Sequence, residues 1–217
     1  MEPFKFYECT ALVRMTGRRA SDLIEFAEII RNVSPASIFH HMHQYFLKPH
    51  IRLPEYPNDF AIWAADALED KILAERLANL NPFEFTNMED IRSEILRIIT
   101  EHLKEYPAPR PVIKGKEFFF NEGITLVAET HLTAATLQEF LEALKEVHTS
   151  SIYFHFYEAR LRLGKALDDF SRFFEDCEEQ ACKQVACRIR SLDPYMYTTE
   201  MLREKIIEIV EARCHGA

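Results

Sequence analysis

The sequence contains two similar halves, and this duplication constrains the fold more than any other feature. Ser37-Ile-Phe-His-His41 returns as Ser151-Ile-Tyr-Phe-His155, and Leu80-Asn-Pro-Phe-Glu-Phe-Thr86 returns as Leu192-Asp-Pro-Tyr-Met-Tyr-Thr198. Further matches, in the same order along the chain, are Asp59-Phe60 with Asp169-Phe170 and Leu23 and Phe26 with Leu137 and Phe140. A duplication of this length predicts two units of similar design that face each other across a pseudo-twofold axis.

A proline-rich stretch separates the two halves. Residues 106–116 contain three prolines, which favour an extended and semi-rigid linker. We therefore predict a first repeat unit at 1–106, a linker at 107–116 and a second repeat unit at 117–217. Because the chain has 217 residues in total, we expect the two units to pack as one globular body.

Each half has the pattern of four helices that follow a short β-prone segment. The β-prone segments are Phe4–Tyr7 in the first half and Phe118–Phe120, continuing to Val127, in the second. These two segments are candidates for pairing with each other. The repeated apolar periodicity and the five glycines indicate helices for most of the remainder. The predicted fold class is mainly α with minor β content.

Capping residues mark the predicted helix starts. The second helix follows Ser34-Pro35, with serine as the cap and proline in the first turn. The third helix begins at Asn58 in the first half and at Asp168 in the second, and in each half it runs to the Leu-Asx-Pro element. Thr86-Asn-Met-Glu89 has the form of a capping box before the fourth helix.

The overall charge argues against several classes of partner. The net charge is −9, and acidic residues are spread evenly through both halves with no basic stripe. An acidic chain of this kind is not expected to bind nucleic acid or an anionic membrane surface. We find no glycine-rich phosphate loop, so no nucleotide or other cofactor is predicted.

The cysteine content and the amino-terminal sequence predict a cytoplasmic protein. The five cysteines show no framework spacing, which favours reduced thiols. The first ten residues do not have the pattern of a signal peptide, and no apolar stretch has the length of a membrane span.

The repeated phrases resemble a known family. Ser-Ile-aromatic-x-His, Asn58-Asp-Phe-Ala-Ile-Trp63, Leu-Asx-Pro-aromatic-x-aromatic-Thr and Phe154-His-Phe-Tyr-Glu-Ala-Arg-Leu-Arg162 together resemble the prokaryotic family catalogued as domain of unknown function 5752. The resemblance covers nearly the whole chain. It implies no established activity and gives no catalytic residue, and it associates the chain with carbohydrate-related gene neighbourhoods.

The histidines matched between the halves are the leading candidates for a site. His41 and His155 lie on the flank of the predicted second helix, and Lys48 and Arg162 follow each of them seven residues later on the same face. Glu158 lies between the second pair. If the two helices meet at the pseudo-axis, these side chains could bind a small anionic or hydroxylated ligand or move a proton. The competing interpretation is structural, with each histidine bonded to a neighbouring helix and an ordinary Glu158–Arg162 pair.

Two other clusters are interpreted as structural. His40, His41 and His43 point in different directions around a helix, so no metal site is predicted. Asp59 and Asp169 could pass for twin catalytic carboxylates, but each follows a helix cap, where an acidic side chain suits the helix dipole.

The sequence therefore favours a non-catalytic module that binds a ligand or a protein partner through its pseudo-symmetric helical face. Exposed aromatic residues at a matched patch would support this function; the candidates are Phe83, Phe85, Tyr195 and Tyr197. The first alternative is an enzyme with a His/Glu/Arg cleft acting on a small polar, carbohydrate-related substrate. The second alternative is a structural or assembly protein, and a homodimer is compatible with all three.

Overall fold

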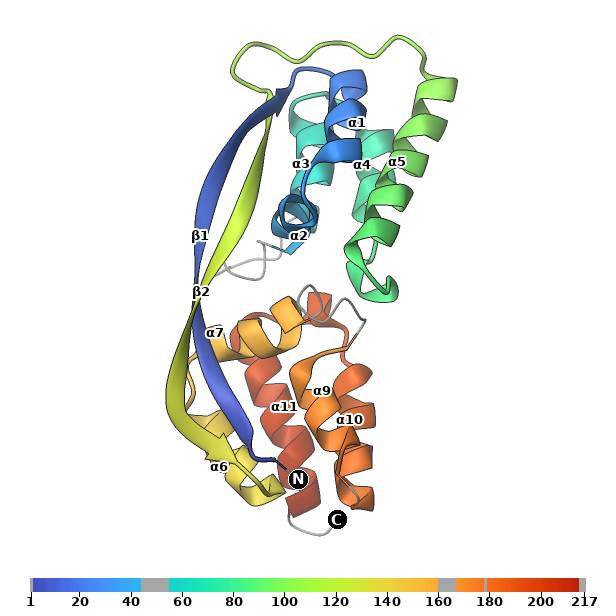
Figure 1. Cartoon of the computed structure of the whole chain (residues 1–217). Helices are drawn as coiled ribbons and strands as arrows, with labels where there is room; N and C mark the ends of the chain where they lie inside the picture. Colours follow the sequence, from blue (N-terminus) through green and yellow to red (C-terminus); the bar gives the residue numbers. More distant parts are fainter. Residues whose placement is uncertain (1, 44–54, 160–166, 178, 215–217) are drawn as a thin grey trace. The chain divides into compact units, whose positions relative to one another are not determined.

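The computed structural model describes residues 2–43, 55–159, 167–177 and 179–214. In this part the protein is mainly helical with one two-stranded sheet, which confirms the predicted fold class at that level (Figure 1). The elements of the first half are β1 (Phe4–Ala20), α1 (Leu23–Asn32), α2 (Pro35–His43), α3 (Asp59–Asp66), α4 (Lys71–Ala78), the 3-10 turn η2 (Pro82–Glu84) and α5 (Met88–Glu105). Those of the second half are β2 (Phe118–Ala134), α6 (Leu137–Glu146), α7 (Thr149–Ile152), the π-helix η3 (Tyr153–Glu158), α9 (Asp169–Glu175), α10 (Gln180–Arg190), the 3-10 turn η4 (Pro194–Met196) and α11 (Thr199–Cys214).

Each half contains five described α-helices, so the predicted number of four is wrong. The expected third helix of the first half is divided into α3 and α4, and between them Glu69 has a φ of 57°. A residue in this left-handed region cannot continue a right-handed helix. In the second half the same segment is divided into α9 and α10.

Side-chain caps begin α3 and α9 where the sequence predicts them. The Asn58 side chain accepts from the Ala61 N–H at 2.9 Å, and the Asp168 carboxylate accepts from the Ser171 N–H at 2.7 Å. Helix α5 differs from the prediction, because Asn87 and not Thr86 caps it. The Asn87 side chain accepts from two N–H groups of the first turn, at 2.9 and 3.0 Å, which leaves no role for the predicted capping box.

The chain forms two compact units, and the boundary between them lies within both strands. Unit N contains residues 12–124, and unit C contains the described residues 2–11, 125–159, 167–177 and 179–214. Unit N therefore has helices α1 to α5 together with the start of β2. Unit C has helices α6 to α11 together with the start of β1. Each set of helices is thus completed by a strand segment that comes from the other half of the sequence.

The two strands pair in antiparallel fashion. Thr16 Oγ1 donates to the Phe120 carbonyl, and Thr130 Oγ1 donates to the Phe6 carbonyl at 2.7 Å. Ten residues back along β1 therefore correspond to ten residues forward along β2. The strands that contain the two β-prone segments pair with each other, but the segments themselves do not. The register of the strands places Phe6 opposite Thr130 and not opposite the aromatic start of β2.

Aromatic side chains from the strands close the helical core of each unit. In unit N, the Phe118 ring lies 5.1 Å from Phe26 and 5.5 Å from Phe60, measured between ring centroids. In unit C, the Phe6 ring lies 5.2 Å from Phe140 and 6.4 Å from Phe170. Burying one such ring contributes roughly 1.5–3 kcal/mol. The strand segment is therefore a major part of each core and not an accessory to it.

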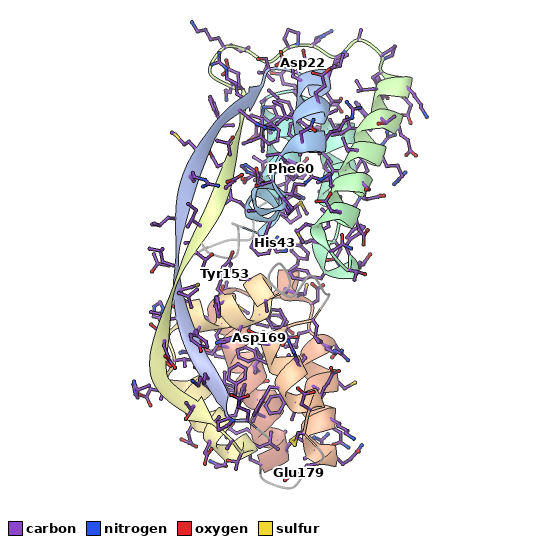
Figure 2. All side chains as sticks on the ribbon, viewed as in Figure 1. Asp22, His43, Phe60, Tyr153, Asp169 and Glu179 are labelled. Carbon is purple, nitrogen blue, oxygen red and sulfur yellow. A yellow bond between two sulfur atoms is a disulfide. The ribbon has the colours of Figure 1, made fainter. Side chains whose placement is uncertain are left out.

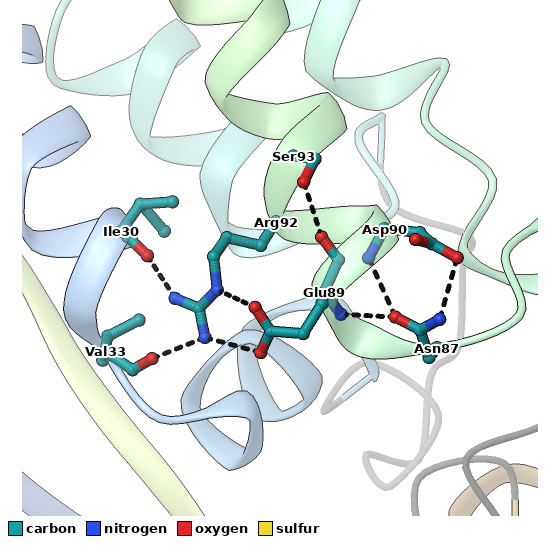
Figure 3. Close-up of polar contacts among 7 residues, drawn as sticks. All are labelled: Ile30, Val33, Asn87, Glu89, Asp90, Arg92 and Ser93. Carbon is teal, nitrogen blue, oxygen red and sulfur yellow. Dashed lines mark hydrogen bonds and ion pairs between the residues drawn. The ribbon is translucent and has the colours of Figure 1, made fainter.

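A buried arginine joins α5 to the end of α1 in unit N (Figure 3). The Arg92 guanidinium donates to the Ile30 carbonyl and, at 2.7 Å, to the Val33 carbonyl. It also pairs with Glu89 one turn earlier on α5. These bonds satisfy carbonyl groups that the last turn of a helix leaves without partners.

A disulfide joins the end of α9 to α10 in unit C. Cys177 and Cys182 are bonded, and their Cα atoms lie 6.0 Å apart, an ordinary separation for a disulfide. The expectation of reduced thiols is therefore wrong for this pair. Cys177 follows α9 and Cys182 lies on α10, so the two residues do not belong to one continuous helix. Within the described residues, no helix combines the length and the apolar character that a bilayer span requires.

Candidate functional site

His155 joins the π-helix of unit C to strand β1 and to α9. Its Nε2 accepts from the Tyr7 N–H at 2.9 Å. Because a backbone N–H only donates, Nε2 carries no proton, and the proton of the neutral ring must lie on Nδ1. Nδ1 then donates to Asp169 Oδ2 at 2.8 Å. The ring is 3% exposed, so its two nitrogens and its orientation are fixed inside the protein.

His41 makes the same set of bonds in unit N. Its Nε2 accepts from the Asn121 N–H at 2.9 Å, and its Nδ1 bonds to Asp59 Oδ2 at 2.8 Å. The carboxylates that follow the Asn58 and Asp168 caps therefore orient a histidine in each unit. This role is more specific than the favourable position near a helix dipole that the sequence suggests.

These bonds limit what the two histidines can do chemically. A general base needs a free ring nitrogen within hydrogen-bond reach of the proton that it removes. In both rings, one nitrogen accepts from the strand and the other faces a carboxylate. Each histidine therefore links helices to a strand through its hydrogen bonds. This geometry leaves neither ring in position to take a proton from a ligand.

A pocket of about 380 Å³ opens beside His155 in unit C. Aromatic rings form part of its wall, including those of Phe4, Phe154 and Phe173. Cationic groups come from Lys5 on β1 and Arg172 on α9, one turn after the labelled Asp169 in Figure 2. Glu2 and Asp176 add carboxylates to the lining. Such a combination of apolar walls with a few polar groups is typical of small-molecule sites.

Of the two cations that line this pocket, Arg172 is the more available to a ligand. It is exposed, and no carboxylate within salt-bridge distance pairs with its guanidinium in the part of the chain that the structure describes. Lys5, in contrast, lies 3.5 Å from Glu129, and Asp169 holds His155. Arg172 thus offers donors for a carboxylate or phosphate group.

The matched position in unit N has a different chemistry. Counted from the shared Asp-Phe pair, Ile62 stands where unit C has Arg172, and Trp63 stands where it has Phe173. The Trp63 Nε1–H donates to the Lys116 carbonyl at 2.9 Å. The cationic pocket is therefore a feature of unit C and not of the repeated design.

The predicted site residues are only partly brought together. Lys48 and Arg162 lie outside the described residues. Glu158 ends the π-helix and does not belong to the described lining of the His155 pocket. Its charge acts elsewhere: burial first, and then Glu158, raise the pKa of the buried Tyr153 well above its ordinary value.

Sequence reasoning missed Lys5 and Arg172. Arg172 follows Asp169 by three residues, so the two share one face of a helix, and this spacing could have revealed it. Lys5 gave no such signal, because its place beside α9 depends on the long-range packing of β1. The matched aromatic patch is also less exposed than expected, since all four of its residues are half-buried; these are Phe83, Phe85, Tyr195 and Tyr197.

Comparisons with known proteins extend over nearly the whole chain. The family described as "Family of unknown function (DUF5752)" matches residues 1–211. A solved structure, titled "The structure of OrfY from Thermoproteus tenax", is similar to this chain with 32% sequence identity and a TM-score of 0.84. The similarity covers 99% of this chain and 97% of that one. A comparison with curated proteins gives no significant match.

Proposed function

This chain belongs to the DUF5752 family of unknown function, and from that premise we propose that it is a non-catalytic module that binds a small polar ligand in unit C. The ligand site is the pocket beside His155. The observation that carries the proposal is the exposed guanidinium of Arg172 at the edge of an aromatic-walled pocket. The ordered histidine and aspartate behind it form a rigid wall, which favours binding because little has to be rearranged.

The lining indicates the chemical class of the ligand. Arg172 and Lys5 suit a phosphate or carboxylate group, and the carboxylates of Glu2 and Asp176 suit hydroxyl donors. The aromatic rings suit an apolar face of the same molecule. A small phosphorylated or carboxylated polyol has all three features, and this class includes the carbohydrate-related ligands that the family resemblance suggests.

The proposal also includes an origin by duplication, with the two units related by a pseudo-twofold axis. Its support is the repetition of specific bonds and not of general shape. His41 with Asp59 and His155 with Asp169 are one such pair of contacts. Arg203 of α11 donates to the Val147 carbonyl at 2.9 Å, as Arg92 of α5 does to carbonyls at the end of α1. The repeat boundaries at 1–106 and 117–217 belong to this proposal.

The test is a ligand screen with a matched pair of variants. Sugars, sugar phosphates and hydroxycarboxylates are added to the full chain, and a ligand that binds the native state raises the unfolding midpoint by mass action. Loss of a charge-assisted hydrogen bond is expected to weaken the binding of a hit to Arg172→Ala by at least about tenfold. Arg188→Ala removes an exposed arginine of the same unit outside the pocket lining and should bind normally.

Three results would count against the proposal. A hit that binds Arg172→Ala as tightly as the wild type lies elsewhere on the protein. A hit that is chemically converted would restore the enzyme alternative, and Nε2 of His155 would then have to leave the Tyr7 N–H. A blank screen would contradict the ligand class and direct the search to a protein partner by pull-down.

A further inference from the structure

Two cysteines and a carboxylate lie together at the junction of α9 and α10 in unit C. Cys177 follows the end of α9, Glu179 directly precedes α10, and Cys182 lies in the first turn of α10. The two Sγ atoms and a carboxylate oxygen all lie within 4.8 Å of one another. Within the described ranges, this is the one group of three or more His, Cys, Asp or Glu side chains that is close enough to share a metal ion.

The carboxylate of Glu179 is not used by the helix that it precedes. Helix α10 begins without a side-chain cap, since Glu179 accepts from no N–H group of the first turn. At the start of α9, by contrast, Asp168 occupies the same position and its carboxylate caps the helix. Glu179 is also exposed, so its carboxylate can turn toward the sulfur atoms without breaking a capping bond.

The backbone places the two cysteines so that their sulfur atoms can either bond to each other or hold one ion. Their Cα atoms lie 6.0 Å apart. A tetrahedral zinc site with Zn–S bonds of about 2.3 Å needs sulfur atoms about 3.8 Å apart, and rotation of the two side chains reaches this distance from the same backbone. Cys182 is buried at the N-terminal end of α10, where the helix dipole stabilises a negatively charged sulfur.

We propose that Cys177, Cys182 and Glu179 bind a thiophilic divalent cation of the zinc class when the disulfide between the cysteines is reduced. Two thiolates and one carboxylate are ligands that zinc accepts, with water in the fourth position. The site goes beyond the proposed function, because none of its three residues lines the Arg172 pocket. It is not part of the repeated design either, because Cys9 of β1 is the only cysteine in residues 1–106.

The disulfide and the metal site are two states of the same pair of cysteines. A dithiol reductant supplies two electrons and two protons: the S–S bond breaks, each sulfur becomes a thiol, and the dithiol closes into its own disulfide. The cation then displaces the two thiol protons to solvent and binds both sulfur atoms. A disulfide oxidant reverses the change, because it takes two electrons from the thiolates, leaves as two thiolates, restores the S–S bond and releases the cation.

The test uses Co²⁺, whose bonds to thiolates give a charge-transfer absorption band, with Zn²⁺ as the competitor. The full chain is prepared in two forms, one reduced and freed of the dithiol without oxygen, and one with the disulfide intact. We expect the reduced chain to bind a single Co²⁺ ion with a thiolate band that excess Zn²⁺ abolishes. The chain with the disulfide intact should give no such band, because Cys177 and Cys182 then offer no thiolate.

Two variants locate the ion, and each has a matched control. Cys177→Ser changes a half-buried cysteine and is expected to weaken Co²⁺ binding at least about hundredfold, whereas Cys187→Ser, an exposed cysteine of α10, should not. Glu179→Gln should weaken binding at least about tenfold and keep the thiolate band. Glu204→Gln, which changes an exposed carboxylate of α11 outside the cluster, should bind Co²⁺ like the wild type.

Three results would overturn the proposal. The first is a reduced chain that gives no thiolate band with Co²⁺ up to about 1 mM, the range of very weak binding. The second is a band of full strength in Cys177→Ser, which would mean that other thiols hold the ion. The third is undiminished binding to Glu179→Gln, which would remove the carboxylate from the site.

Discussion

Single residues decide how the strands are held to the helices, and His155 is the clearest case. Its ring accepts from β1 and donates to α9, so its removal leaves the Tyr7 N–H and the Asp169 carboxylate without their buried partner. We expect His155→Ala to lower the free energy of unfolding by about 2–4 kcal/mol, from lost bonds and the cavity created. Urea denaturation measures this directly.

The matched control is His131→Ala, because the His131 side chain is 83% exposed. Surface substitutions of this kind change stability by no more than about 0.5 kcal/mol. Equal stability of the two variants would show that the hydrogen bonds of His155 to β1 and α9 contribute nothing to the free energy of unfolding.

A second prediction at this scale concerns thiol reactivity. Burial, assisted by Glu158 and Glu8, raises the pKa of the Cys9 thiol to about 12. A raised pKa keeps the thiol protonated from neutral pH up to about pH 11, and only the thiolate reacts with alkylating agents. We expect iodoacetamide at pH 8 to modify the exposed Cys187 in the native protein and to leave Cys9 unmodified, as mass spectrometry of peptides will show.

Unfolding in urea should abolish this difference, because the Cys9 pKa then returns to its ordinary range. Comparable modification of Cys9 and Cys187 in the native state would mean that Cys9 is neither buried nor protonated as described.

At the scale of elements, Arg92 tests how α5 holds α1. Arg92→Ala leaves two carbonyl groups at the end of α1 without their donor, so we expect a loss of about 2–4 kcal/mol in the free energy of unfolding. Arg92→Lys should recover only part of this loss, because an ammonium group cannot reproduce the planar fork of donors. Thermal or urea unfolding provides the measurement.

Arg97→Ala is the control on the same helix. Arg97 pairs with Glu94 and Glu101 at the surface, and exposed pairs contribute at most about 1 kcal/mol. If Arg97→Ala were as harmful as Arg92→Ala, the interhelical bonds of Arg92 would have no special importance.

The elements also show what the sequence could predict. The start of α2 after Ser34-Pro35 and the caps at Asn58 and Asp168 were predictable, because capping depends on residues close together in the chain. The division into α3 and α4 was not, because an apolar stripe continues through both helices and Glu69 carries no sign of a left-handed backbone.

The candidate site was predictable only in its repeated part. The repetition pointed to His41 and His155, and the structure gives each of them a carboxylate and a strand N–H as partners. It could not point to Arg172, whose counterpart in the other half is Ile62. Such unmatched residues acquire their meaning from packing between segments that are distant in the sequence.

For the whole molecule, the central claim is that each set of helices is completed by a strand segment from the other half. This conclusion predicts different behaviour for two fragments that both contain helices α1 to α5. Residues 12–124 contain all of unit N in the described part of the chain. Residues 1–106 keep the helices but lose Phe118, Phe120 and Asn121, which close the core and bind His41.

The measurement is the unfolding of these two fragments, followed by circular dichroism and by their size in solution. We predict that 12–124 is monomeric and unfolds cooperatively, because its core and the hydrogen bonds of His41 to the strand and to α3 are intact. We predict that 1–106, with an exposed apolar face, aggregates or self-associates and shows no cooperative transition. A stable, monomeric 1–106 fragment that unfolds as cooperatively as 12–124 would contradict the account.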